Sequence, residues 1–220
     1  MENVHVSTLQ SNETEVFYPD SDGQPMANNT LHAEYMATTK YGIESVFADR
    51  DDVFVAMDLF WYPVKGKPKI ALAPDVIVAL GRPKGERKSY KQWEEDNIAP
   101  QVVFEFLSES AFFERYGVQE YYIYDVERKE LSGFTRYQEH DDALEPITDM
   151  QDWISPRLGV RFDISSGALQ LYKPDGEPFL SYLELNAELS ETRSELSEAR
   201  KQNELLAAKL RELGVNPDAL

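Results

Sequence analysis

The chain has 220 residues, a formal net charge of −18 and 42% hydrophobic residues, which suffices for one packed domain and an appendage. It contains no cysteine, which excludes disulfides, thiol catalysis and cysteine-based zinc centres, and its three histidines argue against a zinc centre built from several histidines. No window approaches the roughly 18 apolar residues of a membrane span, and the N-terminus lacks a secretory pattern, so we expect a cytoplasmic protein without membrane contact.

The N-terminal part begins with polar, turn-rich residues, and we predict a flexible tail over residues 1–14. The Asn28-Asn29-Thr30 stretch is suited to cap a helix over about residues 30–48, whose apolar face includes Tyr35 and Ile43. An acidic turn follows, and the apolar residues 53–61 then predict a strand.

Two further apolar segments, residues 73–80 and 100–107, each carry one acid, Asp75 and Glu105. Runs of β-branched and aromatic residues of this kind predict strands inside a sheet that is covered on both faces. A carboxyl group there loses hydration, which is costly unless the group is paired, protonated or bound to a metal. Two such acids on neighbouring strands could share a divalent cation. The alternative is structural: Asp75 caps a turn and Glu105 pairs with a basic side chain.

A basic stretch surrounds Asp75 within an otherwise acidic chain. Residues 64–91 contain eight Lys or Arg residues against Asp75 and Glu86, an excess of six positive charges: Lys65, Lys67, Lys69, Arg82, Lys84, Arg87, Lys88 and Lys91. The net charge of the whole chain disfavours nonspecific attraction to DNA, whereas this stretch could contact phosphates. We predict Lys84, Arg87 and Lys88 as phosphate contacts, with a merely solvated loop as the alternative.

The middle of the chain predicts further sheet. A very short helix is expected near residues 110–116, followed by a strand over 120–125. If the strands of Glu105 and Tyr122 are parallel, residues 108–120 must form the whole crossover, which is close to the minimum length of about 10–12 residues. Hairpin-like segments follow over about 131–173, with turns expected at 132–133, 166–167 and 175–176.

The last forty residues predict a long helix with a heptad pattern. Its a positions are Tyr182, Leu189, Leu196, Asn203 and Leu210, and its d positions are Leu185, Thr192, Ala199, Leu206 and Leu213. In a parallel pair Glu188 and Glu195 at g would face Arg193 and Arg200 at e of the partner, and two Asn203 side chains would satisfy each other. The pattern favours a parallel homodimer through residues 182–213, and the alternative is a single amphipathic helix folded back on the core.

The motif formed by Pro74-Asp75 and Glu105-Phe106-Leu107 resembles the PD-(D/E)XK nuclease pattern. The match is closer to one family, the Uma-two type of restriction endonucleases, and it also includes the Trp153-Ile154-Ser155-Pro156-Arg157 stretch. The resemblance implies an α/β fold with a restriction-endonuclease-like mixed β-sheet flanked by helices, followed by a C-terminal coiled-coil helix. The expected boundaries are 15–178 for the nuclease-like domain, 179–213 for the coiled coil and 214–220 for a tail.

The same resemblance implies that Asp75 and Glu105 are catalytic, metal-binding acids, with Mg²⁺ or Mn²⁺ as cofactor and DNA as substrate. The catalytic lysine of the family looks displaced onto the helix after Glu105. Here that segment looks shortened, and its nearest cation, Arg115, stays protonated and is a poor general base. The sequence therefore leaves two hypotheses: a metal-dependent DNA endonuclease or its degenerate descendant, and a non-catalytic binding or scaffolding module that dimerises through its coiled coil.

Overall fold

The computed structural model describes residues 16–20, 29–106, 116–137, 143–214 and 216. Its centre is a six-stranded mixed sheet in the order β1-β3-β5-β6-β7-β8. The pair β5–β6 is parallel and the other neighbours are antiparallel. These strands are β1 (Val53–Met57), β3 (Val76–Leu80), β5 (Val102–Glu105), β6 (Glu120–Asp125), β7 (Glu130–Thr135) and β8 (Glu145–Pro146). The strands predicted around Asp75, Glu105 and Tyr122 are therefore confirmed. The sequence left the direction of the β5–β6 pair open, and the structure makes it parallel.

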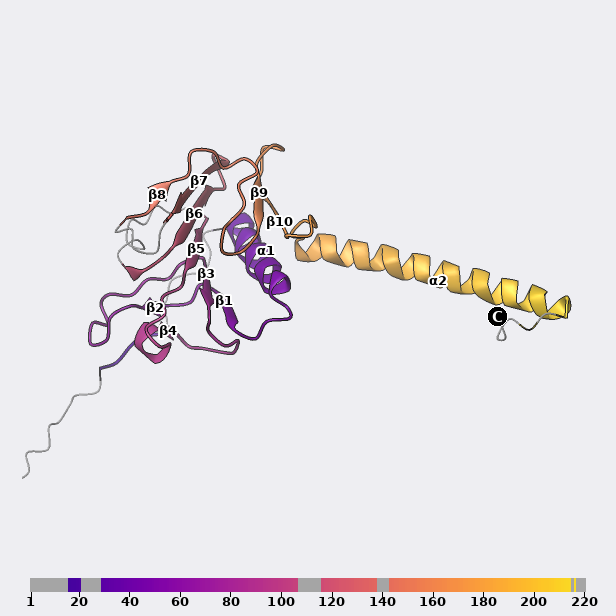
Figure 1. The fold of residues 1–220 in the computed structure, drawn as a ribbon, viewed down its shortest axis with the longest axis horizontal. Helices are drawn as coiled ribbons and strands as arrows, with labels where there is room; N and C mark the ends of the chain where they lie inside the picture. The colour runs from indigo at the N-terminus through magenta and orange to yellow at the C-terminus, as the bar shows by residue number, and fades with distance from the viewer. Residues whose placement is uncertain (1–15, 21–28, 107–115, 138–142, 215, 217–220) are drawn as a thin grey trace, which may run out of the picture.

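One face of the sheet is covered by the helix α1 (Thr30–Val46) and by the hairpin of β9 (Arg161–Asp163) and β10 (Gln170–Tyr172) (Figure 1). Asn29 caps α1 as the sequence predicts, because its side chain accepts a hydrogen bond from the His32 amide. Every third or fourth residue of α1 is buried against the sheet: His32, Met36, Thr39 and Ile43. This spacing is that of a helix with one face in the core.

The other face is covered by a small parallel pair, β2 (Trp61–Tyr62) and β4 (Tyr90–Lys91), with the 3-10 turn η1 (Gln92–Glu94). Trp61 and Tyr90 are fully buried there, against the strands β1, β3 and β5. Both faces of the central strands are thus covered, which explains why those strands read as continuous apolar runs. The fold is α/β, with a mixed sheet, an N-terminal helix on one face and a long C-terminal helix.

Two details differ from the sequence-based expectations. The strand predicted over residues 53–61 is interrupted after β1, because Asp58 takes a left-handed backbone with φ of 48° and breaks the extended run. The turn expected at Ser132-Gly133 is wrong, since both residues lie inside β7. The hairpin turns instead at Lys129, whose φ is 60° and whose amide donates to the Asp125 carbonyl.

Other expectations are confirmed or fall outside the described residues. Gly167 and Gly176 have positive φ and occupy turns as predicted. The short helix expected near 110–116 lies almost wholly in residues 107–115, outside the described chain, and so does the predicted tail over 1–14.

The C-terminal helix α2 (Tyr182–Glu212) projects away from the sheet domain (Figure 1). Ser181 and Glu184 form a reciprocal capping box at its start. None of its residues is buried, and the leucines of the heptad seam are exposed except Leu210, which is half-buried. The alternative of a helix folded back on the core is therefore wrong. Neither α-helix of the described chain combines the length and the apolar character that a bilayer crossing needs.

The junction before α2 is held firmly by the body. Phe179 is 2% exposed, its amide donates to the Leu171 carbonyl, and its carbonyl accepts from the Gln170 side chain. A Cβ atom on Gly42 of α1 would lie 2.1 Å from the Phe179 ring, so only glycine leaves room for that ring. The contact joins two segments far apart in sequence, the helix α1 and the residues just before α2.

Candidate metal-binding and active site

Three acids stand in one row at one end of the sheet. Met57 pairs with Val76, and Val76 pairs with Phe104, so continuing the register by one residue places Asp58 beside Asp75 and Asp75 beside Glu105. The Asp58 amide donates to the Asp75 carbonyl at 3.2 Å, as this continued pairing requires. The sheet therefore brings Asp75 and Glu105 to adjacent backbone positions.

The Asp75 carboxylate is held from two sides at one of its oxygens. Nε2 of His32 lies 2.9 Å from Oδ2, and the backbone amide of Phe106 donates to the same oxygen at 2.5 Å. The His32 and Asp75 side chains are only 6% and 13% exposed. Oδ1 accepts no hydrogen bond from any residue in the described ranges. The carboxylate is thus fixed in place while one oxygen stays available for a further ligand.

Glu105 ends β5 and is 5% exposed. Strand alternation puts it on the face of Val103, toward Trp61 and Tyr90, whereas His32 draws the Asp75 carboxylate toward α1. Within the described residues, no group of three or more His, Asp or Glu side chains is arranged to hold a metal ion. A cation at this end of the sheet would therefore rely on at most two protein carboxylates, with water or substrate supplying its other ligands.

His32 is the partner that sequence reasoning missed. The sequence does contain a signal, because His32 begins the buried series of α1 that continues at Met36, Thr39 and Ile43. A histidine at the start of an apolar helix face is ordinarily a core residue, and only the packing angle of α1 on the sheet brings it to Asp75.

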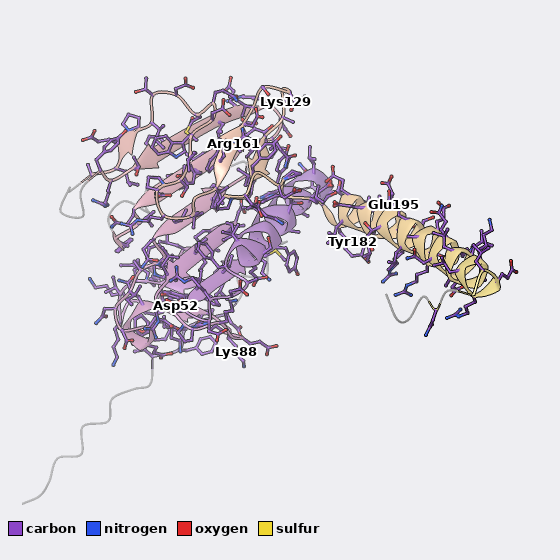
Figure 2. The ribbon with its side chains drawn as sticks, turned by 45° about the vertical axis from the view of Figure 1, so that its right-hand side comes forward. Asp52, Lys88, Lys129, Arg161, Tyr182 and Glu195 are labelled. Atoms are coloured by element: carbon purple, nitrogen blue, oxygen red, sulfur yellow. The ribbon has the colours of Figure 1, made fainter. Side chains whose placement is uncertain are left out.

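The three predicted phosphate contacts lie in the segment that follows β3, whereas Asp75 lies just before it. The ammonium of Lys84 donates to the carbonyls of Phe47 and Ala48, just past the end of α1. Lys88 is exposed at the edge of the body (Figure 2), and it forms no ion pair within the described part of the chain.

Arg87 is paired inside the fold. Its Nε donates to Glu95 Oε1 at 2.6 Å, and Arg82 Nε donates to the other oxygen at 3.0 Å. Burial alone would raise the pKa of Glu95, but the hydrogen bonds from Arg87 and Arg82 hold that pKa below its usual value. Arg87 is therefore ion-paired with a carboxylate that it shares with Arg82, and its guanidinium also lies over the Phe54 ring.

A second buried acid, Glu120, occupies the opposite end of the sheet, where it begins β6 beside Val102. It is 1% exposed and accepts hydrogen bonds from the Tyr122 hydroxyl, the Ser155 hydroxyl and the Arg157 amide. Burial raises its pKa, and these hydrogen bonds only partly counter that effect. Both carboxylate oxygens are engaged, so Glu120 ties β6 to the segment around Ser155.

Comparisons with known proteins show which family the chain belongs to. A crystal structure described as a "putative nuclease" from Anabaena variabilis ATCC 29413 is similar at a TM-score of 0.39 and 16% identity, over 60% of this chain and 72% of that one. No curated protein matches the chain. The model of the Uma2 family, described as "Putative restriction endonuclease", matches residues 9–171, which include α1, the entire central sheet and the row of acids. The chain is therefore a member of the Uma2 family.

Proposed function

We propose that this protein is a metal-dependent endonuclease that hydrolyses phosphodiester bonds in DNA, or a degenerate descendant of such an enzyme. The observation that carries the proposal is the placement of Asp75 and Glu105 at adjacent positions on two central strands of a nuclease-family sheet. Acids are not retained among apolar strand residues without a partner or a task, because their desolvation is costly.

The donor chemistry of these residues fits Mg²⁺ or Mn²⁺. Both ions prefer oxygen ligands, and Mg²⁺ in phosphate-processing sites is held by one or two carboxylates together with water and substrate phosphate. Oδ1 of Asp75 would be its first protein ligand, and the Glu105 side chain, which starts from the opposite face of β5, would have to turn around the strand end to supply the second. A bound ion of this kind lowers the pKa of a coordinated water and offsets the charge that develops on the phosphate oxygens.

The protein's own contribution is to hold these acids ready. His32 and the Phe106 amide fix Asp75 through Oδ2, so the carboxylate does not need to be ordered when a cation arrives. The sequence identifies no counterpart of the catalytic lysine of the family. Metal binding and cleavage are therefore separate questions for this chain. Binding requires only the two acids, whereas hydrolysis also requires a group that takes a proton from water.

The direct test uses purified full-length protein with supercoiled plasmid and with single-stranded DNA, in Mg²⁺, Mn²⁺ or chelator. We expect metal-dependent nicking that is lost in D75N and in E105Q and retained in E145Q, a matched change on the exposed strand β8. A metal-induced rise in melting temperature, also lost in D75N and E105Q, reports binding even where cleavage is absent. If the unmodified protein shows no nicking and no metal-induced rise in melting temperature, the proposal is overturned.

The exposed helix α2 favours a second candidate function, a scaffolding module that assembles as a parallel dimer. Its seam leucines Leu189 and Leu196 are 44% and 50% exposed, although leucines at heptad positions are normally buried by a partner. We expect light scattering to give twice the chain mass for the full-length protein and the single mass for L189E/L196E. A full-length monomer at micromolar concentration would contradict the dimer, and an intact dimer without any metal response would favour the scaffold over the nuclease.

A further inference from the structure

The eight cations of the basic stretch divide into two groups in the structure. Four of them are neutralised or hydrogen-bonded within the fold: Arg82, Lys84, Arg87 and Lys91. The other four form no ion pair with any described residue: Lys65, Lys67, Lys69 and Lys88. Three of these four belong to one segment, the loop from residue 63 to residue 71 that links β2 to β3, which we call the lysine loop.

The lysine loop is an ordered structure with exposed charges. Trp61 and Leu72 close its base with two backbone hydrogen bonds, of 2.7 and 3.0 Å. The Gly66 amide, at a backbone φ of 80°, donates to the Tyr18 hydroxyl at 2.5 Å. Lys65, Lys67 and Lys69 are all exposed, and the loop contains no acid. Three positive charges therefore stand on a braced loop of a strongly acidic chain.

The position of the loop relative to Asp75 is the decisive observation. The chain leaves the sheet at Asp58 and returns at Asp75, and the lysine loop lies between these two points, closed at its base by Trp61 and Leu72. Lys69 is six residues from Asp75, which limits their Cα separation to about 22 Å at full extension. That is about six steps of 3.4 Å along one DNA strand. By contrast, Lys84 contacts Ala48 and lies toward the end of β3 farther from Asp75.

We propose that the lysine loop is the phosphate-binding surface of this protein and that Lys65, Lys67 and Lys69 contact the DNA backbone beside the row of acids. The choice of DNA as the polyanion rests on the proposed function. Exposed ammonium groups that form no ion pair with a described residue can release the counterions of a phosphate backbone, which is the main source of sequence-independent affinity. A paired guanidinium such as that of Arg87 would first have to leave Glu95.

The test is DNA binding at several salt concentrations, measured by fluorescence anisotropy with full-length protein, a labelled 30-base-pair duplex and chelator to prevent cleavage. The variant is K65Q/K67Q/K69Q. Its matched control is R128Q/K129Q/K173Q, which removes three charges elsewhere, including Lys129 at the far end of the body from Lys88 (Figure 2). A single K88Q variant tests the remaining exposed cation of the stretch. Circular dichroism and melting temperature confirm that each variant is folded.

We expect the loop variant to bind at least tenfold more weakly at 50 mM salt. The slope of log affinity against log salt should fall by about 0.9 for each lost phosphate contact, or between two and three for the three lysines. An unchanged slope, an equal loss in the control, or no binding by the unmodified protein at 20 mM salt would overturn the proposal. Because binding is measured without cleavage, a negative nicking assay does not affect the test of the lysine loop. Undiminished nicking by the loop variant would overturn the DNA-binding role of the lysine loop but not the proposed endonuclease activity.

Discussion

The two ends of the central sheet each contain a buried acid on a core strand, and their surroundings differ in kind. At one end Glu120 accepts three hydrogen bonds that engage both oxygens. At the other end Asp75 uses one oxygen for His32 and the Phe106 amide, beside Glu105 and Asp58 in neighbouring registers. Burial alone therefore does not identify a site. What distinguishes the two acids is how many of their carboxylate oxygens are already hydrogen-bonded within the fold.

Removing Glu120 should have the largest effect on stability. E120A leaves the hydroxyls of Tyr122 and Ser155 and the Arg157 amide without their acceptor, at a cost of about 3 kcal/mol or more in the free energy of unfolding. Urea denaturation measures the change. E145A, on the exposed edge strand, should alter stability by less than about 0.5 kcal/mol. If E120A and E145A change the free energy of unfolding equally, the structural role assigned to Glu120 is wrong.

Neutralising Asp75 should change stability little but abolish the response to metal. D75N keeps the size of the side chain, so we expect a change in unfolding free energy of about 1 kcal/mol or less, together with complete loss of the Mn²⁺-induced rise in melting temperature. Differential scanning fluorimetry with and without Mn²⁺ provides both values. A D75N variant that is as unstable as E120A and retains its metal response would place Asp75 in the same structural class as Glu120.

His32 should tune the site without belonging to the set of metal ligands. H32Q removes the imidazole that orients Asp75, and partners of this kind typically change metal affinity by 10–100-fold. Titration calorimetry with Mn²⁺ gives the affinity. H32Q should weaken binding and D75N abolish it, whereas equal loss in both variants would make His32 a ligand in its own right.

The smallest predicted effect is a dependence of stability on pH. Because burial raises the pKa of Glu120 in the folded state, the folded protein binds this proton more tightly than the unfolded chain. As pH rises above the ordinary glutamate value of 4.5, the unmodified protein should lose stability relative to E120Q, until pH passes the raised pKa. Urea denaturation of both proteins between pH 4 and pH 8 checks the sign, and a difference that grows in the opposite direction would contradict it.

Much of the sheet could be predicted because its signal is local. The runs around Asp75, Glu105 and Tyr122 are apolar because both faces of those strands are covered, and the sequence shows this directly. The contact between His32 and Asp75 could not be predicted, because it depends on how α1 lies across the sheet. The row with Asp58 likewise depends on strand register.

Gly133 shows why a local signal can mislead. A Ser-Gly pair ordinarily indicates a turn, but Gly133 lies within β7, where a Cβ atom would sit 2.4 Å from the Met150 sulfur. The glycine is needed for close packing of the segment around Met150 on the strand. Nothing within a short sequence window distinguishes a glycine that turns the chain from one that makes room for a neighbour.

The seat of the Phe179 ring over Gly42 has a consequence for any assembly of this protein. Since the ring is locked into the body and α2 begins three residues later, the direction in which the rod leaves is set by that joint. Two chains paired along α2 would therefore hold their two sheet domains at a fixed angle to each other. A G42A substitution would displace the Phe179 ring and loosen the connection between the sheet domain and α2, while leaving α2 itself unchanged.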